Sequence, residues 1–212
     1  MKLNKEIKQI INILSKKYPD PDTALNYSTP FELLIATILS AQTTDKQVNK
    51  VTKKLFKNYN TPQDLASLKI TELEKLIKSI GLYRNKSKYI IQTSKKIINE
   101  FDGQVPETRK ELMKLPGVGR KTANVVLTCA FTKNAFPVDT HVFRVSNRIG
   151  LVQAENVNEV EKQLMQVIPE KLWGKMHHWL IYLGRELCKA QNPNCNNCDL
   201  NKLCKYYKNT NQ

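Results

Sequence analysis

The sequence predicts an all-α protein. Apolar side chains recur at the spacing of amphipathic helices through most of the 212 residues, and no two alternating segments are joined by a hairpin turn. The connections are short and polar, with no low-complexity linker and no clear internal repeat. We therefore expect a compact helical chain, long enough for one large or two small domains.

Helix boundaries follow from the apolar spacing and from capping residues. Thr29 and Thr61 each precede a proline, and Asn156 precedes Val157, as is typical of helix starts. Only a polar tail is expected after Tyr207. The expected helices are Asn4–Lys17, Pro30–Ser40, Asp45–Phe56, Pro62–Ala66, Ile70–Ser79, Asn85–Phe101, Glu107–Lys114, Lys121–Phe131, Thr140–Ile149, Val157–Val167 and Trp173–Cys188.

The charge of the chain favours a polyanionic partner. Lys and Arg number 34 against 19 Asp and Glu, a formal net charge of +15, although a lysine-rich proteome would give the same excess. No run of 18 apolar residues occurs, so no membrane span is expected. Met1–Lys17 has apolar residues at helical spacing and includes Glu6, which favours an amphipathic helix over a secretory signal. We expect a cytoplasmic protein.

One segment, Leu112–Ala123, combines a turn with two cations. Pro116 should end the preceding helix, while Gly117 and Gly119 permit φ > 0 and leave backbone N–H groups uncovered. Such N–H groups beside a helix N-terminus bind anions such as phosphate, although Gly-x-Gly between helices also occurs as a plain turn. Arg120-Lys121 then places two cations where a helix dipole disfavours them, which indicates a function.

Four of the five cysteines lie near the C-terminus. Cys188, Cys195, Cys198 and Cys204 have the spacing C-x6-C-x2-C-x5-C, whereas Cys129 lies in an apolar helix and is expected to be a buried small hydrophobe. Without a secretory signal, such a cluster favours a metal centre over disulfides. The C-x2-C pair suits zinc and iron–sulfur equally, so the pair alone does not choose between them.

Leu115–Ala123 (Leu-Pro-Gly-Val-Gly-Arg-Lys-Thr-Ala) resembles the helix-hairpin-helix of DNA glycosylases, specifically the endonuclease III branch. Leu39–Asp45, Ile80–Lys86 and Phe136–Val142 resemble the same family, and the cysteine spacing is similar to its [4Fe–4S] loop. The similarity is traceable from about Leu39 to Cys204, and no single motif carries it. A structural zinc site is the alternative to the [4Fe–4S] cluster.

The resemblance implies an architecture that neither composition nor charge reveals. Residues 22–132 would form a six-helix domain containing the helix-hairpin-helix at about 109–128. Residues 1–21 and 133–212 together would form a helical iron–sulfur cluster domain held by the four C-terminal cysteines. Double-stranded DNA with damaged bases or abasic sites would bind in the cleft between the domains.

The resemblance also implies which residues act. Lys121 would be the nucleophile, because an amine attacks a sugar carbon only when unprotonated, and the helix dipole and Arg120 both disfavour its protonated form. Asp139, an expected helix N-cap, would stabilise developing positive charge or assist proton transfer. His141 is expected to be structural, since no step requires an imidazole.

A damaged base must leave the duplex before it is excised, at a cost of a few kcal/mol. Gln42 and Leu82 resemble the family residues that fill the gap, and the DNA-binding set would be completed by Gly117, Val118, Gly119 and Arg120. Read alone, Gln42 is an ordinary helix-start residue, Leu82 a core leucine and Lys121 a phosphate ligand.

The implied function is base-excision repair. We expect a monomeric, bifunctional DNA N-glycosylase and abasic-site lyase that removes oxidised pyrimidines and cuts the strand by β-elimination. Lysine at position 121 distinguishes this branch from the adenine-mismatch branch, which lacks it. The alternatives are a glycosylase that uses water, and a DNA-binding module that performs no catalysis.

Overall fold

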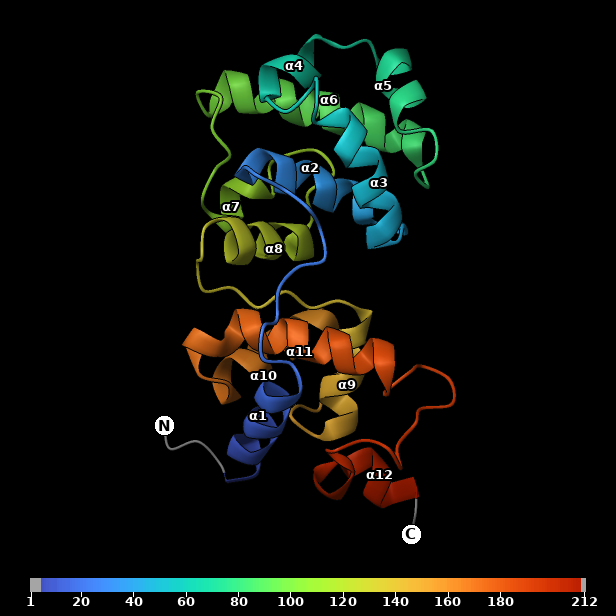
Figure 1. The fold of residues 1–212 in the computed structure, drawn as a ribbon. Helices are drawn as coiled ribbons and strands as arrows, with labels where there is room; N and C mark the ends of the chain where they lie inside the picture. The colour runs from blue at the N-terminus through green and yellow to red at the C-terminus, as the bar shows by residue number, and fades with distance from the viewer. Residues whose placement is uncertain (1–4, 211–212) are drawn as a thin grey trace. The chain divides into compact units, whose positions relative to one another are not determined.

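The computed structural model describes residues 5–210, which divide into two helical units (Figure 1). One unit is Thr23–Lys133, and the other joins the residues up to Asp22 to those from Asn134 onwards. The expected boundaries, 22–132 and the two ends, differ from this division by one residue. No β-strand occurs in residues 5–210, so the all-α prediction is confirmed. No helix of this described part is long and apolar enough to cross a membrane.

The unit from Thr23 to Lys133 contains seven helices where the resemblance implied six. The shortest of them is α7, a helix of only four residues in the segment where Glu107–Lys114 was expected. The helices of this unit are α2 (Pro30–Ser40), α3 (Asp45–Leu55), α4 (Pro62–Ser67), α5 (Ile70–Leu76), α6 (Tyr83–Glu100), α7 (Arg109–Leu112) and α8 (Arg120–Ala130).

Helix α2 forms the core of this unit. Every side chain from Phe31 to Leu39 is buried, as expected of a helix that is apolar around its whole circumference. α2 packs against α3, α6 and α8, and Figure 1 shows it between α6 and α8. Its start is the predicted one, because the Thr29 side chain accepts the Glu32 N–H and Pro30 occupies the first turn.

The second unit is completed by the N-terminal helix. α1 packs against α11, which in turn packs against α9. The helices of this unit are α1 (Lys5–Lys17), α9 (Thr140–Ile149), α10 (Val157–Val167), α11 (Trp173–Glu186) and α12 (Lys205–Thr210), with two short 3₁₀ helices at Glu170–Leu172 and Asn201–Leu203.

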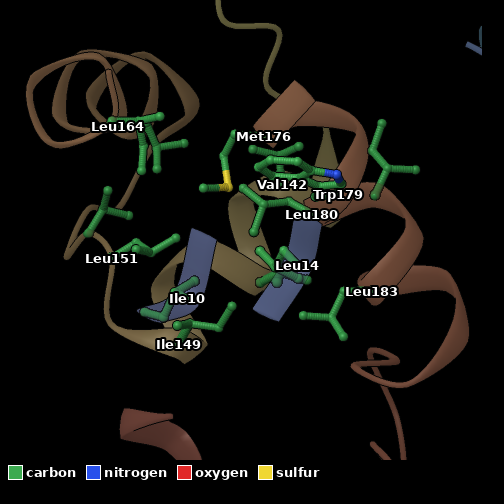
Figure 2. Packing of buried hydrophobic residues seen from close by; sticks show 14 of the residues in the cluster. Ile10, Leu14, Val142, Ile149, Leu151, Leu164, Met176, Trp179, Leu180 and Leu183 are labelled. Atoms are coloured by element: carbon green, nitrogen blue, oxygen red, sulfur yellow. The ribbon is translucent and has the colours of Figure 1, made fainter. Parts of the chain in front are cut away.

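Apolar residues of α1 join the core of the C-terminal helices. Ile10 and Leu14 are buried with Val142 of α9 and with Trp179 and Leu180 of α11 (Figure 2). The amphipathic helix predicted at the N-terminus is therefore confirmed. Full burial of such a side chain contributes about 1.5–3 kcal/mol, so α1 is a structural part of this unit.

The bounds of α2, α9 and α10 agree with the sequence prediction, whereas several other ends differ. α5 ends at Leu76 rather than Ser79, because the Ile80 N–H bonds to the Ile77 carbonyl in a tight turn at 2.8 Å. The described residues of the tail expected after Tyr207, 208–210, instead belong to α12 (Lys205–Thr210). The predicted start of the first helix at Asn4 lies outside the described residues.

Candidate functional site

The hairpin between α7 and α8 has the expected tight turn. Helix α7 ends at Leu112, four residues before Pro116, and the Val118 N–H bonds to the Leu115 carbonyl at 3.1 Å. Gly117 has φ +77°, a conformation that side-chain-bearing residues rarely adopt. Gly119, which also permits φ > 0, instead has an extended backbone with φ −88° and ψ 178°.

Gly119 is not required by the fold in the way that Gly117 is. A Cβ added at Gly119 would meet no atom within 4 Å, whereas one at Gly117 would lie 2.9 Å from Tyr89 Cβ. Since the backbone at Gly119 is extended and open, any residue could stand there without strain. A glycine that neither conformation nor packing requires is consistent with an external ligand approaching the backbone.

Helix α6 supports the hairpin from one side. The Thr93 hydroxyl donates to the Pro116 carbonyl at 2.7 Å, and the ring of Tyr89 covers Gly117. Both supporting residues lie on one face of α6, one turn apart, because residues at i and i+4 are neighbours on a helix. The hairpin is therefore positioned by tertiary contacts as well as by its own sequence.

Lys121 lies in the first turn of α8. The helix begins at Arg120, one residue earlier than predicted, with Gly119 as its N-cap. The Lys121 side chain is exposed, and no ion pair or hydrogen bond joins it to another described side chain of its own unit. An exposed cation at the positive end of a helix, with no carboxylate beside it, lacks the structural role that ion pairing would give.

Gln42 and Leu82 share an unusual backbone conformation. Gln42 has φ +54° and Leu82 has φ +59°, and both side chains are exposed, Leu82 to 55%. The reading of Leu82 as a core leucine is therefore wrong. An added Cβ at Gly81 would lie 3.3 Å from the Gln42 carbonyl oxygen, so the two loops are in contact. The structure thus brings two strained, outward-facing residues of separate loops together.

Asp139 is the N-cap of α9, as predicted. Its Oδ1 accepts the Val142 N–H at 2.8 Å, and the side chain is half-buried. No described group of its own unit donates to Oδ2, so this oxygen remains available. His141 packs against α11 at Gly184 and its Nδ1 lies 3.1 Å from Arg144 Nη2, contacts that fit the expected structural role.

The four C-terminal cysteines line one cavity. Cys188, Cys195, Cys198 and Cys204 surround it together with apolar side chains, and all four are half-buried free thiols. Burial raises the pKa of the Cys195 and Cys198 thiols, and the neighbouring Cys188 and Cys204 raise it further. Cys129, expected to be buried, is half-buried and separate from this group, and its carbonyl accepts the Tyr27 hydroxyl.

Two arginines of α9 anchor the loop that carries these cysteines. Arg144 Nε donates to the Cys188 carbonyl at 3.0 Å, and Arg148 donates to the carbonyls of Lys189 and Ala190 at 2.6 and 3.0 Å. Arg148 Nη1 also lies 3.6 Å from Cys188 Sγ. Neither arginine is among the site residues predicted from the sequence, although their i, i+4 spacing on a predicted helix places them on one face.

Four thiolates can hold either of the metals that the sequence left open, a zinc ion or an iron–sulfur cluster. The four C-terminal cysteines line one cavity, so they are placed to bind a single metal centre of either kind.

Comparison with known proteins identifies the family of this hairpin and cysteine loop. The family model of the HhH-GPD superfamily base excision DNA repair proteins matches residues 35–170. The chain belongs to this superfamily. Endonuclease III of Rickettsia prowazekii (strain Madrid E) is 51% identical to it over 202 residues, 95% of each chain. Endonuclease III of Bacillus subtilis (strain 168) is 50% identical, covering 95% of this chain and 92% of that protein.

The fold of this chain is also similar to that of a solved endonuclease III structure. The structure of a trapped endonuclease III–DNA covalent intermediate, an estranged-adenine complex, superposes with a TM-score of 0.93 over 100% of both chains at 49% identity. The resemblance to the endonuclease III branch is confirmed by these relatives.

Proposed function

We propose that this chain removes oxidised pyrimidines from duplex DNA and cuts the strand at the resulting abasic site. Membership of a base excision DNA repair family supports the proposal, as do relatives named endonuclease III. One of these relatives was captured as a covalent intermediate with DNA, which supports a nucleophile on the protein rather than water. Within this chain, the single observation that carries the proposal is Lys121, exposed and unpaired in its unit beside the open backbone of Gly119.

The hairpin would hold the DNA backbone. The N–H groups of Gly117 and Gly119 lie in the hairpin just before α8, with Arg120 beside them, an arrangement suited to a phosphate. The Val118 N–H already bonds to the Leu115 carbonyl, so Val118 would contribute through the shape of the turn. The formal net charge of +15 would strengthen binding to any duplex, because each phosphate contact releases counterions. These phosphate contacts would position the protein on the duplex without any preference for its base sequence.

Gln42 and Leu82 would stabilise the duplex from which a nucleotide has been extruded. Leu82 is apolar and exposed at a loop tip, so it can replace the lost stacking partner. Gln42 carries an amide that can donate to and accept from the base left unpaired. Two wedge residues of this kind would offset the few kcal/mol that extrusion costs.

Lys121 would then act on the sugar. Its unprotonated amine attacks C1′ and forms a C–N bond, while the C1′–N bond to the base breaks and the base leaves with a proton. The lysine nitrogen then loses a proton and the sugar ring opens: the C1′–O4′ bond breaks, O4′ takes a proton, and an iminium forms between C1′ and the lysine nitrogen. Loss of a C2′ proton then breaks the C3′–O bond and releases the 3′-phosphate, so excision and strand scission follow from one nucleophile. Asp139 would stabilise positive charge on the sugar or carry the protons.

The C-terminal loop would hold a [4Fe–4S] cluster through Cys188, Cys195, Cys198 and Cys204. Such a cluster would cross-link a loop with little regular structure through the four thiolates, and metal binding of this kind is coupled to local folding. Arg144 and Arg148 would fix the loop against α9. We expect the enzyme to act as a monomer in the cytoplasm, associated with the chromosome.

Borohydride trapping tests the proposal. The protein is incubated with a duplex carrying one oxidised pyrimidine in the presence of borohydride, which reduces the iminium to a stable protein–DNA adduct. Lys121→Gln should abolish the adduct but retain most of the DNA affinity, because the phosphate contacts remain. Lys114→Gln, which removes another exposed lysine near the hairpin, is the matched control and should form the adduct normally.

Three outcomes would contradict parts of the proposal. An adduct in the Lys121→Gln protein, mapped to another amine, would assign the nucleophile elsewhere. Free base released without any adduct would indicate a glycosylase that uses water. Neither base release nor nicking would leave a DNA-binding module without catalysis.

A further inference from the structure

Lys86 is a buried cation at an unfavourable place in its helix. Its side chain is only 3% exposed, although lysine is almost never fully buried without partners. It lies in the first turns of α6, where the helix dipole disfavours positive charge, and burial lowers its pKa. No acidic side chain of residues 5–210 forms an ion pair with it. The stability of α6 therefore does not account for a lysine at this position.

The ammonium of Lys86 closes the end of another helix. Nζ donates to the Leu39 and Ala41 carbonyls at 2.8 and 2.6 Å and to the Thr43 hydroxyl at 3.3 Å, so its three N–H groups have three acceptors. Leu39 is in the last turn of α2 and Ala41 is its C-cap. Lys86 therefore satisfies carbonyls that α2 leaves unpaired, at the negative end of that helix dipole.

Two of the residues that accept hydrogen bonds from Lys86 are the sequence neighbours of Gln42. Ala41 precedes Gln42 and Thr43 follows it, and Gln42 has φ +54°. A left-handed conformation at such a residue persists only when its surroundings hold it there. Lys86 fixes the groups on both sides of Gln42, so it restrains the backbone that gives the Gln42 side chain its direction.

Lys86 also connects the loop that contains Gln42 to Leu82. Lys86 belongs to the helix whose N-cap is Leu82, and the Lys86 N–H bonds to the Leu82 carbonyl at 3.1 Å. A further bond, from Gln47 Nε2 of α3 to Ser79 Oγ at 2.7 Å, joins the helix that follows Gln42 to the loop that precedes Leu82. Farther along α6, Tyr89 and Thr93 contact the hairpin. One helix thus carries contacts to both loops and to the hairpin.

We propose that Lys86 is a positioning residue for base extrusion, holding Gln42 and Leu82 in register as a two-part wedge. The proposal rests on the proposed function, in which these two side chains fill the gap in the duplex. Lys86 itself would touch neither the DNA nor the sugar. Removing its ammonium should release Gln42 from the left-handed conformation and separate the two loop tips, while the phosphate-binding hairpin keeps its Thr93 and Tyr89 contacts.

The test compares two substrates in Lys86→Met, which keeps the length of the side chain but donates nothing. On a duplex with an oxidised pyrimidine, the rate of adduct formation should fall about tenfold or more, since about 1.4 kcal/mol of lost wedge stabilisation corresponds to a factor of ten. On a preformed abasic site, which has no base to extrude, the fall should be much smaller. Lys95→Met removes an exposed lysine of the same helix and is the control for charge.

A fluorescence measurement distinguishes a misplaced wedge from a general loss of DNA affinity. A 2-aminopurine opposite the lesion becomes fluorescent when it loses its stacking partner, and the parent and Lys95→Met proteins should raise this signal. Lys86→Met should raise it less while binding undamaged duplex as tightly as Lys95→Met. If Lys86→Met does not fold, Thr43→Val is used instead, because it removes one acceptor at nearly constant volume and should shift the ratio of the two rates in the same direction.

The outcomes distinguish the two proposals. Equal losses on both substrates, or an unchanged ratio in the variant that folds, would overturn the positioning role of Lys86. A parent protein that forms no adduct with either substrate would instead refute the proposed function.

Discussion

Gly119→Ala should separate DNA binding from stability. Two effects of the substitution on stability oppose one another. Alanine restricts the unfolded chain, which stabilises the fold by about 0.4–1 kcal/mol. Alanine is also a poorer N-cap than glycine, which destabilises the fold by a similar amount. With φ −88° and nothing within 4 Å of the added Cβ, no strain or clash is added. The free energy of unfolding should therefore change by less than about 1 kcal/mol.

DNA affinity should respond very differently. If a phosphate oxygen accepts the hairpin N–H groups, the new methyl stands in its path, and losing one charge-assisted hydrogen bond costs about 1.5–3 kcal/mol. The Kd for a duplex with a non-cleavable abasic analogue should then rise about tenfold or more, measured by fluorescence anisotropy at fixed salt.

Gly117→Ala provides the comparison. Its φ of +77° and the Tyr89 atoms at 2.9–3.0 Å mean that alanine there should lower the thermal midpoint of unfolding as well as the affinity. A Gly119→Ala protein that binds DNA like the parent would refute the phosphate grip at this position and leave the hairpin as a turn. A large loss of stability in Gly119→Ala would refute the conclusion that the fold tolerates a side chain there.

Two further predictions concern the metal centre and a helix cap. Cys198→Ser should lose the broad absorption near about 400 nm that an iron–sulfur centre gives, and the loop from Cys188 to Cys204 should become sensitive to protease; metal analysis of the parent that finds zinc without iron would contradict this. Asp64→Asn should weaken the capping box of α4, in which Asp64 and Thr61 bond to each other's backbone N–H. The Thr61 hydroxyl lowers the pKa of Asp64 below 3.8, so its carboxylate contributes fully above pH 3.8 and loses its contribution as pH falls through the lower folded value. The stability difference between parent and variant, from unfolding at pH 5 and pH 3, should therefore shrink on acidification, and a difference that grows would refute the assignment.

Local sequence determined most of the helices and the identity of the hairpin. α2, α9 and α10 were predicted to the residue because each starts at a cap whose side chain can bond the first N–H groups, at Thr29, Asp139 and Asn156. The resemblance to the endonuclease III branch also rests on short continuous segments, which can be recognised in the sequence without knowledge of the fold. Capping and turn chemistry act within about four residues, so they can be read from sequence.

Tertiary structure alone decided how the loops are held. Lys86 and Ala41 are 45 residues apart, and Arg148 and Lys189 are 41 apart, so no local pattern pairs them. The left-handed backbone at Gln42 and Leu82 was equally hidden, because neither residue type favours it and only the surrounding contacts enforce it. The sequence by itself thus determined which helices and motifs exist. The directions of the exposed side chains were decided by buried polar contacts between distant segments, since an unsatisfied donor or acceptor in the interior is too costly to leave unpaired.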